Sequence, residues 1–305
     1  MLRGIIPIVF VPFGEDGLVD EISLRRVVRF ELEGGANGLG INGFASEAYK
    51  LTDQERLLTA AIVADEVAGQ VPLVIGLAAG SLEAAKSQVR VLSRHNPAAF
   101  MVLPPSTMNN GPRALVKHYL GLAAFSPFPL MVQQSPHIPQ YAHTLLSTED
   151  LAEMAHNSEM IRYFKIEGAG APERMKALQA VLPGHAAQFG GVGGLTFLDE
   201  LQIGAAGVIP GAGFNEVFHQ AWAAWESGDK RKVAEILSYY QPVVQAVSSL
   251  GHEFSLHARK ALLLRAGLIA SAYVRTPTVE VTPQDIAAVF AAADRYALRV
   301  SRTEP

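Results

Sequence analysis

Cysteine is absent from this 305-residue sequence. Disulfide bonds and thiolate chemistry are therefore excluded, and a zinc site would have to use histidine and carboxylate ligands. The absence fits a protein of the reducing cytoplasm, and we expect a cytoplasmic location.

Charge is also scarce, since charged residues make up 18% of the chain and the formal net charge is -4. No basic cluster interleaved with aromatic residues occurs, so we expect no nucleic-acid partner. No apolar run reaches the roughly 18 residues of a membrane span, so we expect no membrane partner. The short apolar run Gly4–Phe10 is broken by Pro7, and we interpret it as a strand and not as a signal sequence.

Hydrophobic residues make up 49% of the chain, enough to build a substantial core. Short apolar runs alternate with longer amphipathic segments up to about residue 227, which is typical of repeated βα units around a parallel sheet. The runs are nearly continuous, as expected for strands buried on both faces. The eight predicted strands are Gly4–Phe10, Gly38–Asn42, Val71–Leu77, Ala99–Leu103, Pro129–Gln133, Ile161–Ile166, His185–Phe189 and Gly207–Pro210.

Helix start signals lie between these runs. Thr52 to Glu55 forms a capping box, Ser81 precedes the helical stretch Leu82–Leu92, and Ser147 precedes Thr148–Ala155. Eight such units predict an α/β fold, the (β/α)8 TIM barrel. The competing open sheet usually carries a strand-Gly-x-Gly-x-x-Gly-helix element at its first strand, and no such element follows the first predicted strand here.

After Gly228 the strand signals stop. Three helical stretches are predicted at 231–249, 254–267 and 283–298, and they need a surface on which to bury their apolar faces. No linker rich in proline, glycine or serine separates them from the barrel. We therefore predict a barrel over residues 1–227 and a C-terminal helical bundle over 228–305 that packs on it.

Lys165 stands out near the end of the sixth predicted strand, between Phe164 and Ile166. Reactive residues of such barrels lie at the carboxyl ends of strands and in the following loops. A buried lysine with a depressed pKa can supply the free amine that attacks a ketone and forms an imine. The alternative is a structural lysine that reaches solvent or pairs with Glu167.

Other polar or glycine-rich loops follow the second, fifth, seventh and eighth predicted strands. Small residues and Ser46 after the second strand form a potential nest for a carboxylate, although an ordinary βα turn has the same composition. Gln133 and His137 lie after the fifth strand and could reach a polar ligand. Two glycine-rich segments, 190–194 and 207–213, follow the seventh strand and span the eighth. They are predicted either to bind phosphate or to leave room for a substrate.

Taken in order, these elements resemble the dihydrodipicolinate synthase/N-acetylneuraminate lyase family of class I aldolases and dehydratases. The resemblance covers nearly the whole chain, and Lys165 falls where the family carries its imine-forming lysine. It implies a barrel with a helical tail, a Lys165 imine, and a homo-oligomer, commonly a tetramer. The matching segments are Pro7–Phe13, Asp16-Gly17, Val19-Asp20, Gly43–Glu47, Leu51–Arg56, Phe164-Lys165 and Gly204–Ile209.

The departures from the family pattern narrow the expected reaction. The paired threonines are Phe44 and Ala45 here, and the proton-shuttling tyrosine of the fifth strand is replaced in Val132-Gln133. Where the family has a tyrosine after the fourth strand, this sequence has about Ser106. Where the synthase branch has an arginine that binds its substrate, this sequence has about His137. The branch that contains L-2-keto-3-deoxyarabonate dehydratase is resembled instead by the strings Met131–Gln133, Phe164–Glu167 and Ala45–Glu47, although its acidic pair after the seventh strand is replaced here by the run Gly190–Gly194.

Three functions remain open from the sequence. The first is a hydro-lyase that dehydrates a 2-keto-3-deoxy sugar acid through an imine on Lys165. The second keeps the imine but cleaves a carbon–carbon bond to give pyruvate, or runs a dihydrodipicolinate synthase-type condensation. The third is a catalytically silent barrel that binds a ligand.

The predicted site takes a small-molecule 2-keto acid, with no cofactor and no metal, because the imine itself serves as the electron sink. The predicted catalytic residues are Lys165, Glu47, Glu167 and His137. The predicted substrate-binding residues are Gly43, Phe44, Ala45, Ser46, Gln133, Gly190, Gly191, Val208 and Ile209.

Overall fold

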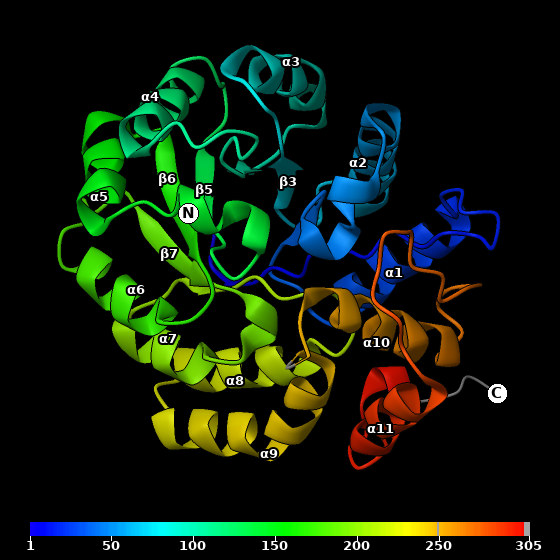
Figure 1. Ribbon diagram of the computed structural model, residues 1–305. Helices are drawn as coiled ribbons and strands as arrows, with labels where there is room; N and C mark the ends of the chain where they lie inside the picture. Colours follow the sequence, from blue (N-terminus) through cyan, green and yellow to red (C-terminus); the bar gives the residue numbers. More distant parts are fainter. Residues whose placement is uncertain (249, 302–305) are drawn as a thin grey trace.

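A computed structural model describes residues 1–248 and 250–301, and its eight parallel strands form the predicted barrel (Figure 1). The strands pair in the order β1-β8-β7-β6-β5-β4-β3-β2. Ile8 bridges Gly40 on one side and Gly211 on the other, which joins the two ends of this order and closes the ring. The strands are β1 (Gly4–Ile5), β2 (Leu39–Ile41), β3 (Leu73–Leu77), β4 (Ala99–Val102), β5 (Leu130–Gln134), β6 (Ile161–Ile166), β7 (Ala187–Gly190) and β8 (Gly207–Val208).

Helices alternate with the strands and surround them. The predicted start signals are confirmed: Ser81 Oγ accepts from the Ala84 N–H, and capping boxes open α2 at Thr52 and α5 at Ser147. The helices of the ring are α1 (Glu21–Glu33), α2 (Asp53–Val67), α3 (Leu82–Leu92), α4 (Pro112–Ala123), α5 (Thr148–Asn157), α6 (Ala171–Gln179), α7 (Phe197–Ile203) and α8 (Glu216–Glu226).

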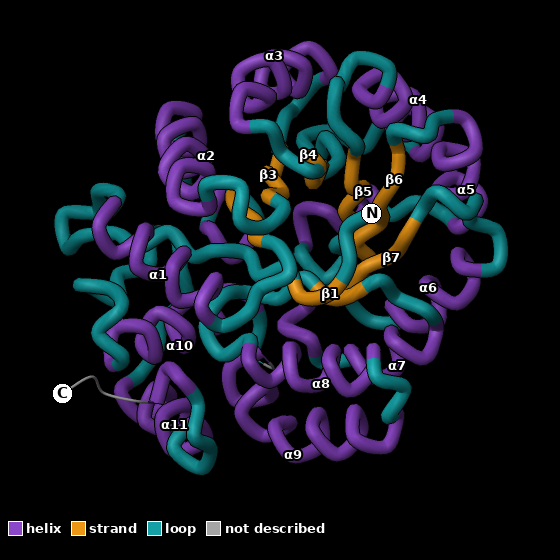
Figure 2. Tube along the Cα trace, turned by 180° about the vertical axis from the view of Figure 1, so that it is seen from behind, coloured by secondary structure: helices purple, strands orange, loops and turns teal. Residues whose placement is uncertain are grey.

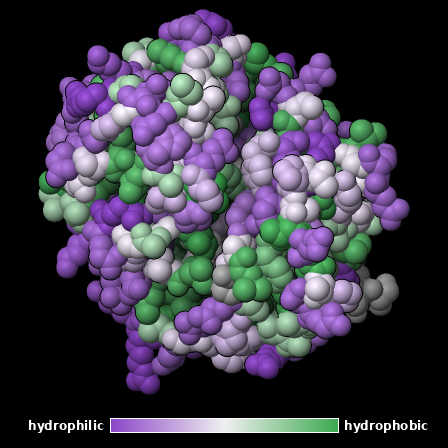
Figure 3. All heavy atoms as spheres, in the orientation of Figure 1, coloured by the Kyte–Doolittle hydropathy of each residue, from purple (hydrophilic) through white to green (hydrophobic). Residues whose placement is uncertain are grey.

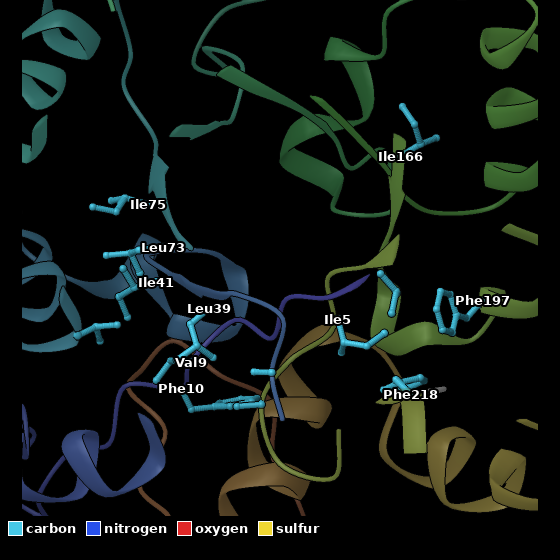
Figure 4. Packing of buried hydrophobic residues seen from close by; sticks show 14 of the residues in the cluster. Ile5, Val9, Phe10, Leu39, Ile41, Leu73, Ile75, Ile166, Phe197 and Phe218 are labelled. Atoms are coloured by element: carbon cyan, nitrogen blue, oxygen red, sulfur yellow. The ribbon is translucent and has the colours of Figure 1, made fainter. Parts of the chain in front are cut away.

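Two hydrophobic layers result from the alternation of side chains along each strand. The inner layer fills the barrel with residues such as Met131, Tyr163 and Phe189. The outer layer packs the strands against the helices, and Figure 4 shows Ile41, Ile75 and other members of this layer. A strand residue therefore faces either the barrel interior or the helices, and its neighbour in sequence faces the other way.

The C-terminal helices are α9 (Lys230–Ser248), α10 (His252–Arg265) and α11 (Pro283–Ala293). They lie on one side of the ring, beside α8 and α1, as Figures 1 and 2 both show. The last position of the predicted helix 231–249 and residues 302–305 of the predicted bundle lie outside the described residues. The predicted helix 283–298 is too long, because α11 ends at Ala293 and the chain turns so that Tyr296 packs against Tyr239 and Tyr240.

Hydrophilic residues cover most of the face shown in Figure 3, as expected where helices turn their polar sides to solvent. Among the described residues, no helix is long and apolar enough to cross a membrane.

Candidate active site

Lys165 points into the barrel. It lies two residues after Tyr163, a member of the inner hydrophobic layer, and side chains two apart on a strand share a face. It pairs in register with Gln133 on β5 and with Phe189 on β7. Only 5% of Lys165 is exposed, and its Nζ lies 3.4 Å from Glu167 Oε1. The lysine is therefore held inside the ring near the carboxyl ends of the strands, facing a carboxylate.

Glu167 is surrounded by donors. Its Oε2 accepts from Ser135 Oγ at 2.5 Å and from Gln133 Nε2 at 2.9 Å, while its Oε1 accepts from the Val192 N–H at 3.1 Å. Burial by itself raises the pKa of Glu167, but the charge of Lys165 and these hydrogen bonds outweigh it and lower the pKa to about 2. The group is therefore a carboxylate whose position is fixed by several partners.

The glycine run after β7 makes room for two buried carboxylates. A Cβ on Gly190 would lie 1.7 Å from Glu200 Oε2, and a Cβ on Gly191 would lie 2.1 Å from Glu167 Oε1. The next residue, Val192, has a φ of 44°, which is unusual for a β-branched side chain. This backbone turn directs the Val192 N–H at Glu167. The run thus shapes the site through close approach of the backbone.

Lys165 lines a pocket with a volume of about 120 Å³. One part of its lining comes from β6 and the loop after β5, with Lys165, Glu167 and His137. The opposite part comes from the C-terminal helices, with Ser248 at the end of α9 and His252 and Arg259 on α10. The barrel and the helical tail therefore build one site together.

Two histidines lie in this lining. Burial is the main cause that lowers the pKa of His137 and of His252 below the ordinary value, although the nearby Glu167 acts in the opposite direction on both. The His252 ring packs against Phe44 at 5.7 Å, and its buried Nε2 has no hydrogen-bond partner. Both rings are therefore neutral near pH 7 and can accept a proton.

Glu47 lies elsewhere. Its carboxylate is fully buried and accepts from Lys260 at 2.5 Å, Lys50 at 3.2 Å and the Arg275 N–H at 3.1 Å. It does not belong to the lining of the pocket. Glu47 ties the loop after β2 to α10 and to the segment that follows it.

The predicted substrate-binding residues divide in the same way. Phe44, Ala45 and Ile209 line the pocket. Ser46 donates to the Val9 carbonyl oxygen at 2.7 Å, and a Cβ on Gly43 would meet Ile8 and Met101, so both face the barrel wall. Gln133, Gly190, Gly191 and Val208 stand behind the lining, where Gln133 and Gly191 contact Glu167.

The C-terminal helices contribute residues to the pocket that were not predicted from the sequence. Arg259 is 2% exposed, and its Nη1 donates to the carbonyl oxygens of Gly211 and Ala212. Arg259 and Lys260 lie in a helix that holds several other polar residues, so nothing in the sequence singles them out as Lys165 is singled out in its apolar strand. Ser135, the donor to Glu167, was also missed, although it lies between Gln133 and His137. Among the described residues, no group of three or more potential ligands is arranged to hold a metal ion.

Comparisons with known proteins agree with this geometry. The model of the dihydrodipicolinate synthetase family matches residues 1–295. L-2-keto-3-deoxyarabonate dehydratase of Azospirillum brasilense is 30% identical over 298 residues, which cover 96% of this chain and 94% of that protein. A 4-hydroxy-tetrahydrodipicolinate synthase of Shewanella baltica is 27% identical over 285 residues, with 93% and 94% covered. The structure of YagE, a prophage protein of the dihydrodipicolinic acid synthase family from E. coli K12 in complex with pyruvate, superimposes with a TM-score of 0.88 at 19% identity, covering 97% of this chain and 98% of that one.

Proposed function

Because the chain belongs to the dihydrodipicolinate synthetase family of lyases, we propose that it forms an imine between Lys165 and a 2-keto acid and dehydrates a 2-keto-3-deoxy sugar acid. The observation that carries the proposal is the buried Lys165 amine in a pocket, 3.4 Å from a carboxylate. The similarity to a protein named as a 2-keto-3-deoxyarabonate dehydratase supports the choice of substrate class.

In the first step, Lys165 Nζ in its free-amine form attacks the C2 carbonyl and water leaves, which gives an iminium ion. The free amine arises when the ammonium form gives up a proton, and the departing carbonyl oxygen takes this proton and one from the attacking amine, so Glu167 faces the ammonium before the step and the iminium after it. A carboxylate with a pKa of about 2 remains charged at neutral pH and stabilises the iminium. We therefore assign Glu167 to electrostatic stabilisation of the intermediate.

In the second step, a base removes a proton from C3 and the iminium becomes an enamine. The enamine expels the C4 hydroxyl, which takes up a proton and leaves as water, and hydrolysis of the imine then frees Lys165. We propose His137 as the proton carrier, because its neutral ring lines the same pocket and accepts protons more readily than the strongly acidic Glu167.

The C1 carboxylate needs donors near Lys165. The hydroxyl of Ser46 and the amide of Gln133 already have partners in the structure. The first N–H groups of a helical turn have none within the turn, and Phe44 and Ala45 begin such a turn in the lining. We propose that these backbone N–H groups hold the carboxylate.

Retro-aldol cleavage is the second candidate, since it differs only in the fate of the C4 hydroxyl. Among the described residues that line the pocket, none is a tyrosine, the residue whose hydroxyl relays protons in the family. This observation favours dehydration. Incubation with a 2-keto-3-deoxypentonate separates the two: dehydration and tautomerisation give a semialdehyde, whereas cleavage gives pyruvate and an aldehyde.

We expect the semialdehyde as the main product by chromatography. Pyruvate as the main product contradicts the dehydratase and supports the aldolase. Absence of turnover with retained ligand binding supports a silent barrel. The homotetramer and the cytoplasmic location stay predictions, and light scattering measures the first.

A further inference from the structure

Arg259 is a buried arginine of α10 that lines the pocket. Its Nη1 donates to two backbone carbonyl oxygens, while its buried Nη2 has no hydrogen-bond partner. In the described part of the chain no carboxylate forms an ion pair with it. Glu31, the acid that acts on it over a distance, is bound to Gly213 and Asn215. A desolvated charge held only by neutral groups is costly unless a ligand neutralises it.

Burial has the expected effect on this group. It lowers the pKa of Arg259 to about 10, so the guanidinium is still charged at neutral pH. The guanidinium also lies over the Phe214 ring at 4.6 Å. A ring face and two carbonyl groups fix its orientation and leave Nη2 without a partner among the described residues, beside the pocket that Arg259 lines.

Ser248 adds a second unused donor at the same place. Its buried Oγ has no hydrogen-bond partner and lies 2.4 Å from the position that a Cβ on Gly193 would occupy. Arg259 Nη2 lies 3.5 Å from the same position. Both residues line the pocket. A side chain at Gly193 would collide with Ser248 Oγ, so the glycine lets this hydroxyl and the guanidinium of Arg259 approach the same point.

In the proposed function the keto end of the substrate lies at Lys165, which lines the same pocket as Arg259 and Ser248. Lys165 pairs in register with Phe189 on β7, and Phe189 pairs in register with Gly207 on β8. Gly193 and Gly211, the neighbours of Arg259, each lie four residues further toward the loops, a span of at most about 14 Å. A C1 carboxylate is bonded directly to the imine carbon and must stay near Lys165 Nζ. In the proposed function the N–H groups of Phe44 and Ala45 hold this carboxylate, so an anion bound by Arg259 and Ser248 is a second one.

We propose that Arg259 and Ser248 form a subsite for an anionic group at the end of the substrate remote from its keto carbon. Within the 2-keto-3-deoxy sugar acids of the proposed function, the preferred substrates thus carry a second, terminal anion, either a carboxylate or a phosphate. Hydrogen bonds from a guanidinium to either group are strong because both partners are charged. The inference rests on the proposed function for the keto end and adds the chemistry of the other end.

Two matched ligand pairs test the subsite and distinguish the two anions. 2-Oxoglutarate and 2-oxopentanoate have the same chain length and differ in the terminal carboxylate. 2-Keto-3-deoxygluconate 6-phosphate and 2-keto-3-deoxygluconate differ in the phosphate. Calorimetry gives the affinity ratio within each pair, and we expect a ratio of at least about tenfold in favour of the terminal anion in at least one pair. The pair with the larger ratio identifies the anion.

The variants are Arg259→Gln and Ser248→Ala, with Arg295→Gln as the control because Arg295 is an exposed arginine. We expect Arg259→Gln to bring the ratio close to one and Ser248→Ala to lower it severalfold. Arg295→Gln keeps the ratio of the parent protein. Ser248 Oγ has no partner to lose, so Ser248→Ala tests the subsite even where Arg259→Gln fails to fold.

All ratios are also measured in the Lys165→Ala background, where no imine forms. A protein that traps no keto acid on Lys165 but keeps the ratio contradicts the proposed function and supports the subsite. A ratio near one in both pairs of the parent protein overturns the subsite. A ratio that survives both Arg259→Gln and Ser248→Ala overturns it as well.

Discussion

On one side of the pocket, Glu167 accepts from Ser135, Gln133 and the Val192 N–H and faces the Lys165 amine. On the opposite side, formed by the C-terminal helices, the buried atoms Arg259 Nη2, Ser248 Oγ and His252 Nε2 have no hydrogen-bond partner among the residues that the structure describes. We call these the lysine side and the helical side. A group that must stay in place through a reaction benefits from fixed partners, whereas unused donors and acceptors are what a ligand can satisfy.

We assign imine formation and proton transfer to the lysine side, and recognition of the remote end of the substrate to the helical side. Substitutions on the lysine side should then lower turnover of every substrate. Substitutions of Arg259 and Ser248 should change the preference among substrates. The following predictions are ordered by the size of the expected effect.

Removal of the amine has the largest effect. Lys165→Ala takes away the nucleophile, so we expect turnover to fall below detection while the fold remains. The matched control is Lys176→Ala, since Lys176 is exposed on α6. Steady-state kinetics with the same 2-keto-3-deoxy acid compare the two. Measurable turnover of Lys165→Ala would remove the lysine side from the mechanism.

Loss of the proton carrier comes next. We expect His137→Gln to lower kcat by about 10²- to 10⁴-fold, the usual contribution of a general base. Because burial lowers the pKa of His137, the parent enzyme should lose activity only as the pH falls below the ordinary histidine range. This acid limb should be absent from the variant. His156→Gln, on the exposed side of α5, is the control, and a pH profile that is unchanged in His137→Gln contradicts the assignment.

A substitution that displaces Glu167 without removing it should lower kcat/KM by a smaller factor. A Cβ on Gly191 would lie 2.1 Å from Glu167 Oε1, whereas a Cβ on Gly184 would meet nothing within 4 Å. We expect Gly191→Ala to lower kcat/KM by roughly 10²-fold, the effect of a misplacement of about 1 Å. Gly184→Ala should match the parent protein. Equal kinetics of the two variants would show that the position of Glu167 does not matter.

The buried Glu200 behind Gly190 affects stability and not chemistry. Burial raises the pKa of Glu200 to about 7, above the ordinary 4.5, so between these pH values the folded protein holds a proton that the unfolded chain has lost. The free energy of unfolding should therefore fall as the pH rises from 4.5 to 7, by a few kcal/mol at most.

Glu200→Gln should reduce this pH dependence, and denaturant unfolding across the same pH range measures it. Glu173→Gln, at an exposed position of α6, is the control. The slope should be the same in this control as in the parent protein. A slope that persists undiminished in Glu200→Gln would contradict the raised pKa. Glu31 has a pKa raised to about 7 by burial as well, so a part of the slope remains in the variant.

The sequence predicted the barrel and the lysine side well because both depend on local patterns. Strand runs follow from continuous apolar segments, and the caps at Ser81 and Ser147 act within three residues. Lys165 was recognisable as a charge inside an apolar strand. His137 follows the fifth strand, and the structure places it in the same pocket as Lys165.

The helical side could not be predicted in the same way, because tertiary packing creates it. Arg259 meets Gly211 across 48 positions of sequence, and Glu47 meets Lys260 across 213. A carboxylate predicted from its loop to be catalytic therefore lies in an ion-pair network instead of in the pocket lining. Nothing local in α9 and α10 indicates which of their polar residues face the pocket.

The central claim is an imine on Lys165, and borohydride reduction in the presence of pyruvate tests it most directly. We predict that mass spectrometry of the digested protein finds one reduced pyruvate adduct, on the peptide that contains Lys165. Without pyruvate, or in Lys165→Ala, the adduct should be absent. An unmodified Lys165 under these conditions, or an adduct on another lysine, would contradict the account.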